Sequence, residues 1–381
     1  MKQSYLVTEW VDQKTGAKGY MVIDELKGGF CAGGIRMRQG VTKEEVVRLA
    51  ETMTIKMAGL GMAVGGAKGG IDFPSNDEES EGVLKRYLEA HAPYIKEYWL
   101  TSEDLGTREE DIVRLLNELG IQSSVQAFIS KQNNKQLLMK NLQEAMTAIY
   151  EGQALTELVT GYGVAVVTEQ ALKKIGTEPA QAKVSIQGFG SVGASAAKFL
   201  YQKGFKIVAV ADIDGTIYYK EGLDIDLLLS LKDHRGNINR NGLPERYEQL
   251  SGEKWLELDV DVLIPAAIAD VINAQNVRFV KANLIVEGAN LPVTEEAEAI
   301  LFEKGVPVIP DFIANSGGAG LFVAVLDGNV DGKAEEIFTF LGGRLTITID
   351  TVLTAVAKEN IPARKAAKTL VESLSKEESY L

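Results

Sequence analysis

A lysine stands among five small residues at positions 65–70, where the sequence reads Gly-Gly-Ala-Lys-Gly-Gly. Because glycine has no side chain, the backbone can pack closely around Lys68 and a substrate can approach it. Burial disfavours the charged form of an ammonium group, so a buried lysine can act as a general base near neutral pH. We therefore predict that Lys68 is a catalytic base. The alternative is a glycine-rich turn that carries a solvated lysine.

Two further charged residues suit the same chemistry. Lys56 lies 12 residues before Lys68, and Asp104 lies 36 residues after it, within positions 101–107. Two lysines and a carboxylate suit the oxidation of an amino acid: one lysine pairs with the substrate carboxylate, the other activates water, and the aspartate transfers protons. Oxidation by a nicotinamide would give an imine, which water hydrolyses with release of ammonia. The alternative for Asp104 is a carboxylate that caps a helix or a turn.

A glycine pattern typical of dinucleotide binding lies in the second half of the chain. Gly188, Gly190 and Gly193 stand between an expected strand and an expected helix, and Asp212 ends the next expected strand. In this context the first glycine permits a tight turn, the second lets the backbone approach a pyrophosphate, and the third allows close helix packing. Amides at the helix N-terminus favour phosphate. The predicted cofactor-binding residues here are Gly188, Gly190, Ser191, Val192, Gly193, Asp212 and Ile213.

The residues around Asp212 favour NAD over NADP. The Asp212 carboxylate would accept hydrogen bonds from the ribose hydroxyls of the adenosine. A 2′-phosphate would instead meet Asp212 and Asp214, and no basic residue follows before Lys220. The alternative for this region is a glycine turn followed by an incidental aspartate.

Composition and charge limit the class of protein. The 381 residues are 45% hydrophobic and 24% charged, which is ordinary for a globular protein, and the length suggests two domains. A net charge of −13 argues against nucleic acid and against an anionic membrane as partners. We see no signal segment and no apolar run of membrane-spanning length, so we expect a cytoplasmic protein.

Cysteine and histidine are too few for the usual metal sites. Cys31 is the only cysteine, so no internal disulfide can form, as is common in a reducing compartment. The two histidines are His91 and His234, and His234 lies in a charged, glycine-containing run typical of a surface loop. Neither a histidine triad nor a Cys/His metal cluster can be assembled. We expect no metal, so acid–base chemistry falls to lysine and carboxylates.

The pattern of apolar segments predicts an α/β protein with two domains. In the first part of the chain, apolar spacing predicts helices near residues 43–59, 84–94 and 108–119. From residue 182 onward, short apolar strands alternate with helical stretches, which is typical of a Rossmann-type, doubly wound sheet. We place an α/β substrate and oligomerisation domain at residues 1–125, a helical linker at 126–159 and the NAD-binding domain at 160–344. A last helix at about 345–381 is expected to pack back on the first domain.

Several short motifs occur in a fixed order between about residues 30 and 320. They are Gly33-Gly34-Ile35-Arg36-Met37, Lys56, residues 65–70, Glu103-Asp104-Leu105-Gly106, Thr160-Gly161-Tyr162-Gly163, the glycine pattern at 188–193, Glu287-Gly288-Ala289-Asn290 and residues 310–318. By these motifs the sequence resembles the glutamate/leucine/phenylalanine/valine dehydrogenase family. The resemblance implies reversible NAD-dependent oxidative deamination of an L-amino acid to the 2-oxo acid and ammonia, by a homo-oligomer.

The resemblance also implies roles for single residues. Lys56 would bind the α-carboxylate of the substrate, Lys68 would be the general base, and Asp104 would be its proton-transfer partner. Arg36 is expected to stabilise the fold and not to touch substrate. The positions expected beside the nicotinamide or the substrate in the second domain are Thr160, Asn290 and Asn315. For Asn290 and Asn315 the alternative is that each caps a loop.

Two positions depart from the glutamate-specific members of the family. Those members place a lysine just before the glycine pair that matches Gly33 and Gly34, and a hydroxyl seven residues beyond the position of Asn315. This sequence has Ala32 and Phe322 there. A buried glutamate side chain would lose a cation and a hydroxyl partner, at a cost on the order of several kcal/mol. We predict an apolar pocket; the alternatives are a shifted alignment, or a Phe322 that points into the core.

The segment before the Thr-Gly motif departs from the family as well. The family has a Gly/Ser-rich turn there, whereas residues 135–150 carry apolar side chains at helical spacing. The leading hypothesis is an NAD-dependent amino acid dehydrogenase with an apolar substrate. The alternatives are a glutamate dehydrogenase with an altered pocket and a nucleotide-binding relative without turnover. The joint presence of Lys56, Lys68 and Asp104 argues against the second.

Overall fold

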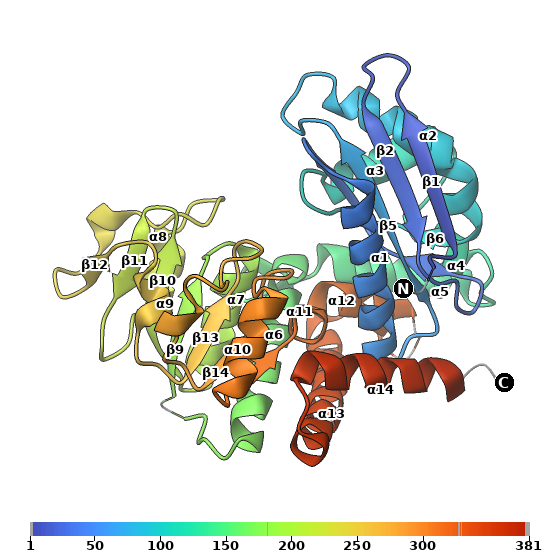
Figure 1. Ribbon diagram of the computed structural model, residues 1–381. Coiled ribbons are helices and arrows are strands. Elements are labelled where there is room, and N and C mark those ends of the chain that lie inside the picture. The colour runs from blue at the N-terminus through green and yellow to red at the C-terminus, as the bar shows by residue number, and fades with distance from the viewer. Residues whose placement is uncertain (1–2, 181, 327, 329, 378–381) are drawn as a thin grey trace. The chain divides into compact units, whose positions relative to one another are not determined.

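The computed structural model describes residues 3–180, 182–326, 328 and 330–377 (Figure 1). The chain divides after Lys140 into two compact units, residues 1–140 and 141–381, and each unit has its own sheet. The division falls inside the segment expected as a linker. The assigned domain boundaries and the docking of the last helix stay predictions.

The first unit is a sheet with helices on both faces. Its strands are β1 (Leu6–Val11), β2 (Lys18–Ile23), β3 (Cys31–Ala32), β4 (Ile35–Arg38), β5 (Gly65–Asp72) and β6 (Trp99–Leu100). Its helices are α1 (Lys43–Gly59), α2 (Ser80–Glu97), α3 (Glu109–Glu118), α4 (Gln126–Ile129) and the start of α5 (Lys135–Thr147). The sheet order is β1-β2-β5-β3-β6, and β4 also pairs with β5. The helices predicted near residues 43–59, 84–94, 108–119 and 135–150 are therefore confirmed.

The glycine-rich run that carries Lys68 is β5, a central strand and not a turn. Strand β2 pairs with it in antiparallel register, and β3 and β4 pair with it in parallel register. Glycine is usually depleted in strands, but close packing explains why β5 contains several glycines. A Cβ on Gly66 would lie 2.1 Å from the backbone nitrogen of Thr54, and a Cβ on Gly70 would lie 2.3 Å from Val46 Cγ2. Glycine thus allows α1 to lie directly on β5.

The face of this sheet opposite α1 holds the main core of the first unit. Tyr87 and Leu88 of α2, Ile112 of α3 and Trp99 of β6 are fully buried there. Each large apolar side chain contributes roughly 2 kcal/mol by its removal from water. The Trp99 indole Nε1–H donates to the carbonyl oxygen of Gly33 at 2.8 Å, which ties the core to the connection between β3 and β4.

The second unit contains the predicted doubly wound sheet. The strands of this sheet are β9 (Lys183–Gln187), β10 (Lys206–Asp212), β11 (Gly215–Tyr218), β12 (Glu248–Leu250), β13 (Val262–Pro265), β14 (Leu284–Val286) and β15 (Val308–Ile309). Strands β7 (Ile149–Tyr150) and β8 (Gln153–Ala154) form a separate two-stranded sheet. The helices of this unit are α6 (Leu155–Lys174), α7 (Ser191–Gln202), α8 (Ile225–Leu231), α9 (Lys254–Glu257), α10 (Glu295–Glu303), α11 (Asp311–Ala314), α12 (Gly317–Leu326), α13 (Ala334–Glu359) and α14 (Ala363–Glu377), with 3₁₀ turns η1 (Arg240–Gly242) and η2 (Val277–Phe279).

The strand order of this sheet is β12-β11-β10-β9-β13-β14-β15. Strands β10, β9, β13, β14 and β15 are parallel, whereas β11 and β12 add an antiparallel edge that the sequence did not predict. The chain passes from β9 to β10 on one side and later returns to β13 on the other side of β9. Such a reversal is the point at which α/β sheets bind ligands beyond the carboxyl ends of their strands.

The C-terminal segment differs from the expected single helix at 345–381. It forms α13 and α14, separated at Asn360, which has a φ of 52°, and at Pro362. By length and composition alone α13 could cross a membrane, with a mean hydropathy of 1.3, so the expectation of no such run is wrong. Its buried residues repeat at helical spacing, and α13 packs on α6, α12 and α14.

Candidate active site

Lys68, Asp104, Arg36 and Glu45 form a buried ionic group in the first unit, here called the Lys68 cluster. Lys68 Nζ lies 3.2 Å from Asp104 Oδ1, and Arg36 Nε donates to Asp104 Oδ2 at 2.6 Å. Arg36 Nη1 donates to Glu45 Oε1 at 2.8 Å. Arg36 pairs with Gly70 in the β4–β5 register, so Arg36 and Lys68 project from the same face of the sheet. The structure thus brings the two predicted acid–base residues together.

The surroundings of Asp104 keep it ionised. Burial raises the pKa of Asp104, but the charges of Lys68 and Arg36 and their hydrogen bonds outweigh burial and lower it to about 2. A carboxylate with so low a pKa orients Lys68 well and accepts a proton poorly at neutral pH. Arg36, which the sequence assigned to the fold, acts directly on this carboxylate.

Two predicted substrate-binding residues belong to the sheet face that carries Lys68 or to the helix over it: Ala32 lies on that face, and Lys56 lies on α1. Ala32 pairs with Gly66 in parallel register, and Gly66 lies two residues before Lys68, so the Ala32 side chain projects from the face that carries Lys68. Helix α1 covers this face. Lys56 is a buried residue of α1 with 9% of its surface exposed.

The glycine pair Gly33 and Gly34 is required by packing. A Cβ on Gly33 would lie 1.7 Å from the carbonyl oxygen of Ala67, and a Cβ on Gly34 would lie 2.2 Å from that of Glu103. Any side chain here would therefore push the β3–β4 connection away from β5 and from the loop that carries Asp104.

Met53 is a residue of this region that the sequence analysis missed. Met53 Cγ lies 3.3 Å from the position that a Cβ on Gly33 would take. Met53 also precedes Lys56 by three residues on α1, so both lie on one side of that helix. This spacing in the sequence would have revealed an apolar neighbour of the predicted substrate residues.

The glycine turn of the second unit has the geometry expected of a phosphate-binding turn. Gly188 follows β9 with a φ of +92°, a conformation that favours glycine. A Cβ on Gly193 would lie 2.0 Å from the Gly188 carbonyl oxygen, so a side chain there would separate α7 from the turn. A Cβ on Gly190 would meet no atom of the described residues within 4 Å, so the space on the Cβ side of Gly190 is open to a ligand. Ser191 and Val192 follow as the first residues of α7.

Asp212 stands at the end of β10 as predicted, but its carboxylate is already bound. The backbone N–H of Asp214 donates to Oδ1 at 2.9 Å, and that of Ile238 donates to Oδ2 at 2.8 Å. Arg240 donates through Nη1 to Oδ2 at 2.8 Å and through Nη2 to Oδ1. The Asp212 side chain is only 2% exposed, whereas the next residue, Ile213, is 85% exposed.

The expectation that no cation comes near Asp212 is therefore wrong. Lys220 is the first basic residue after Asp212 in the sequence, but Arg240 of η1, 28 residues after Asp212, reaches its carboxylate. No local pattern in the sequence signals this pair.

Five of the remaining predicted or neighbouring residues lie on or near α12 in the second unit. Asn315 ends α11, and it donates through Nδ2 to Asn290 Oδ1 at 3.1 Å. Gly318 and Phe322 follow Asn315 by three and seven residues, and neither is among the buried residues of α12. The Thr160 hydroxyl lies 3.1 Å from the position of a Cβ on Gly318. Phe322 therefore lies outside the core of this unit.

Arg364, Glu287, Asp311 and Glu298 form a second buried ionic group, here called the Arg364 cluster. Arg364 donates to Glu287 Oε2 at 2.6 Å, to Glu298 Oε2 at 2.7 Å and to Asp311 Oδ1 at 3.2 Å. Burial raises the pKa of Glu287 to about 8, with a contribution from the negative charge of Asp311. Asp311 Oδ2 also accepts from the backbone N–H of Leu291 at 3.1 Å, next to Asn290.

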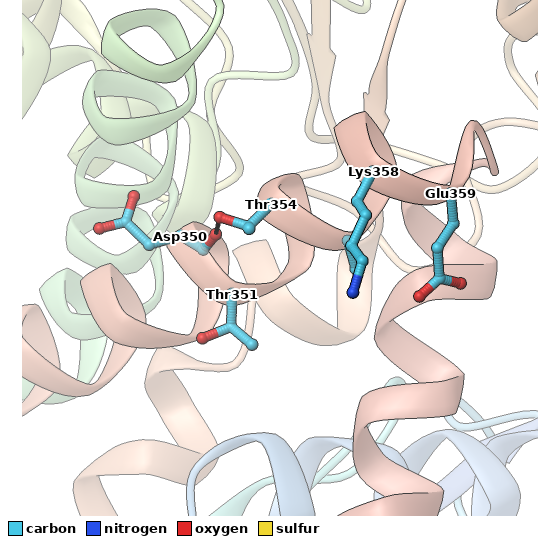
Figure 2. A pocket seen from close by; sticks show the side chains of 6 residues that line it. Asp350, Thr351, Thr354, Lys358 and Glu359 are labelled. Atoms are coloured by element: carbon cyan, nitrogen blue, oxygen red, sulfur yellow. Dashed lines mark hydrogen bonds between the residues drawn. The ribbon is translucent and has the colours of Figure 1, made fainter.

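A hollow on the surface of α13 lies apart from these residues. Asp350, Thr351, Thr354 and Lys358 project into it, and the Thr354 hydroxyl donates to the backbone carbonyl of Asp350 (Figure 2). Its lining residues include none of the predicted site residues. A mixed polar surface along one helix provides neither the glycine turn nor the buried lysine that the proposed chemistry needs.

The two units together define a class: a two-domain α/β protein with a dinucleotide-type sheet and a buried lysine beside a carboxylate. Residues 151–376 match Glutamate/Leucine/Phenylalanine/Valine dehydrogenase, and residues 2–120 match Glu/Leu/Phe/Val dehydrogenase, dimerisation domain. The chain belongs to this family of amino acid dehydrogenases.

Similar proteins agree with this assignment. Glutamate dehydrogenase A2 of Halobacterium salinarum is 34% identical over 375 residues, which cover 91% of this chain and 82% of the relative. The NAD-specific glutamate dehydrogenase of Staphylococcus aureus is 32% identical over 346 residues, 89% of this chain and 80% of the relative. The hetero-hexameric glutamate dehydrogenase of Thermus thermophilus (Leu bound form) superimposes with a TM-score of 0.78 at 27% identity, over 98% of this chain and 89% of that chain.

Proposed function

We propose that this protein catalyses the reversible NAD-dependent oxidative deamination of an L-amino acid with an apolar side chain. Family membership supports the reaction. The observation that supports the apolar preference is Ala32, a small apolar residue on the same sheet face as Lys68, where glutamate-specific members have a lysine.

The glycine turn of the second unit fits NAD. The space on the Cβ side of Gly190 is open, α7 presents the amides of Ser191 and Val192, and the exposed side chain of Ile213 offers an apolar surface beside Asp212. A relative at 32% identity is named as NAD-specific. Bound NAD would supply a hydride acceptor. Thr160 and Asn290 are the residues proposed on its nicotinamide side.

The side chains of the first unit supply binding and acid–base chemistry. Lys56 pairs with the α-carboxylate of the amino acid, which fixes the orientation of the reacting carbon. Lys68 takes a proton from water as the water oxygen attacks the imine carbon. Asp104 stays ionised and holds Lys68 in place. Two cations lower the pKa of Asp104, which adds an electrostatic role to its predicted role as proton-transfer partner.

Three apolar residues disfavour a glutamate side chain. Ala32 offers no cation, and Met53 adds an apolar side chain beside Gly33. Phe322 offers no hydroxyl and is not buried in the core of its own unit. A glutamate carboxylate taken out of water without partners costs several kcal/mol. Glutamate is the second candidate substrate, because several similar proteins are glutamate dehydrogenases.

NADH formation from NAD with a panel of L-amino acids at mildly alkaline pH tests the proposal. We expect turnover of leucine, valine or phenylalanine with little on glutamate, and a gain of glutamate turnover in Ala32→Lys combined with Phe322→Ser. Preference for glutamate in the unchanged enzyme would retain the reaction and reject the apolar pocket. No turnover across the panel, despite NADH binding, would reject the catalytic role.

We also propose a homo-oligomer. The match of residues 2–120 to a dimerisation domain and the hexameric assembly named for the Thermus thermophilus protein support it. Strand β1 stands at the edge of its sheet and exposes Val7 and Val11 on alternate positions. Light scattering of the purified protein measures the assembly directly, and a monomer at micromolar concentration would contradict the proposal.

A further inference from the structure

A loop that the sequence analysis placed on the surface lies against the glycine turn. A Cβ on Gly236 would lie 2.7 Å from the backbone nitrogen of Gly190 and 2.8 Å from the carbonyl carbon of Phe189. The Asp233 carboxylate shapes this loop, because its Oδ1 accepts the N–H groups of Arg235 and Asn237. The segment at 232–240 therefore borders the carboxyl ends of β9 and β10, where the adenosine end of the proposed coenzyme would lie.

The Asp212 carboxylate at this border has no acceptor position left. An ionised carboxylate offers about four lone-pair positions. Asp214, Ile238 and both terminal nitrogens of Arg240 fill them, two on each oxygen. Two ribose hydroxyls cannot both donate to Asp212 while Arg240 keeps this geometry.

The same pair changes the charge at the ribose position. A lone aspartate at the end of β10 would repel a 2′-phosphate, whereas the Asp212–Arg240 pair carries no net charge. The exposed side chains of His234 and Arg235 extend from the neighbouring loop, where the charge of Arg235 offsets that of Asp233. Charge at this position thus favours a 2′-phosphate more than the sequence alone predicted.

We propose that Arg240 sets the coenzyme selectivity of this enzyme by neutralising Asp212, so that NADP is accepted together with NAD. The inference rests on the proposed coenzyme site at the glycine turn. Arg240 acts through Asp212 and is a positioning residue. It also donates to the carbonyl oxygens of Ile238 and Gly215, so a structural role must be separated from a selective one.

Titration of the purified protein with NADH and with NADPH, followed by coenzyme fluorescence, gives two dissociation constants and their ratio. We expect the unchanged protein to bind both coenzymes within about tenfold of each other. Arg240→Ala should weaken NADPH relative to NADH by about tenfold or more, because it leaves the Asp212 charge unopposed. Arg240→Lys should retain most of the NADPH binding. Arg246→Ala is the matched control, since Arg246 stacks on Tyr219 and Tyr247 in the same unit.

A structural role predicts a different pattern, because disorder of the segment at 232–240 would weaken both coenzymes alike. Adding Asp212→Asn to Arg240→Ala should return the ratio to within about threefold of that of the unchanged protein. An unchanged ratio in Arg240→Ala overturns the inference and leaves the coenzyme site intact. Failure of the unchanged protein to bind either coenzyme overturns the coenzyme site and the inference together.

Discussion

The Lys68 cluster and the Arg364 cluster are both buried ionic groups, one in each unit, and they differ in the balance of their charges. In the Lys68 cluster two cations contact two carboxylates, whereas among the described residues of the Arg364 cluster one cation contacts three. The outcome for the carboxylates is opposite. The pKa of Asp104 falls to about 2, and burial raises that of Glu287 to about 8.

The difference shows that burial alone does not decide the protonation of a carboxylate. Asp104 has two cations at hydrogen-bonding distance, and they outweigh the cost of its burial. Glu287 shares one guanidinium with Asp311 and Glu298, so it holds a proton more tightly than an exposed glutamate. A balanced cluster keeps fixed charges beside a proposed catalytic base. An unbalanced cluster ties α14 to the segments after β14 and β15 and carries a group that titrates near neutral pH.

Removal of Lys68 gives the largest expected effect on activity. Lys68→Ala takes away the proposed general base, so kcat should fall by about a thousandfold. NADH binding should persist because the glycine turn is untouched, and fluorescence titration measures it. Lys85→Ala is the control, since Lys85 forms an exposed ion pair with Glu118 in the same unit. A variant that keeps more than about a tenth of the turnover would remove Lys68 from the chemistry.

Removal of Arg364 gives the largest expected effect on stability. Arg364→Leu leaves the three carboxylates of its cluster without their shared cation, and loss of one partner of a buried ion pair costs about 3–5 kcal/mol. Urea unfolding of the variant and the unchanged protein at pH 7 gives the difference in free energy of unfolding. Lys358→Leu, at an exposed position of α13, should change it by less than about 1 kcal/mol. If Arg364→Leu and Lys358→Leu lose the same free energy of unfolding, the charge imbalance of the Arg364 cluster has no effect on stability.

Much of the fold follows from local patterns in the sequence. Apolar spacing predicted α1 over Lys43–Gly59 with its correct ends, and the glycine pattern after β9 has the predicted turn geometry at Gly188 and Gly193. Strand β5 was missed because glycine disfavours strands. The close approach of α1 requires glycine at Gly66 and Gly70, and this packing overrides propensity.

The ion pairs of the two clusters, and the pair between Arg240 and Asp212, could not be predicted from local patterns. Arg240 binds Asp212 across 28 residues, and Arg364 binds Glu287 across 77 residues. Arg36 reaches Asp104 because Ile35 forms a parallel bridge with Glu103, and not because of any spacing between the two residues. Partners brought together by the tertiary fold leave no periodic signal in the sequence, so these ion pairs could not be predicted from it.

The pH dependence of stability tests the unequal charges of the Arg364 cluster. Because folding raises the pKa of Glu287 from 4.5 to about 8, its contribution is fully present below about pH 4.5 and is lost as the pH rises towards 8. Glu287→Gln removes this titration, so the free energy of unfolding of the variant should vary less over that range, by up to about 5 kcal/mol. Urea unfolding at several pH values measures the slope. Glu296→Gln, at an exposed position of α10, is the control and should keep the slope of the unchanged protein.

The smallest effect is expected from Arg36→Gln, which takes one of two cations from Asp104. The lowered pKa of Asp104 contributes stability above about pH 4, and this contribution is lost as the pH falls towards 2. Without Arg36 the pKa should rise, so the contribution at neutral pH shrinks by about 1 kcal/mol and acid unfolding begins at a higher pH. Fluorescence of the buried Trp99 follows the acid transition. Arg38→Gln is the matched control, because Arg38 contacts Glu45 and lies on the same strand. If the two variants unfold at the same pH, Arg36 acts through Glu45, and the balance of charge on Asp104 rests on Lys68 alone.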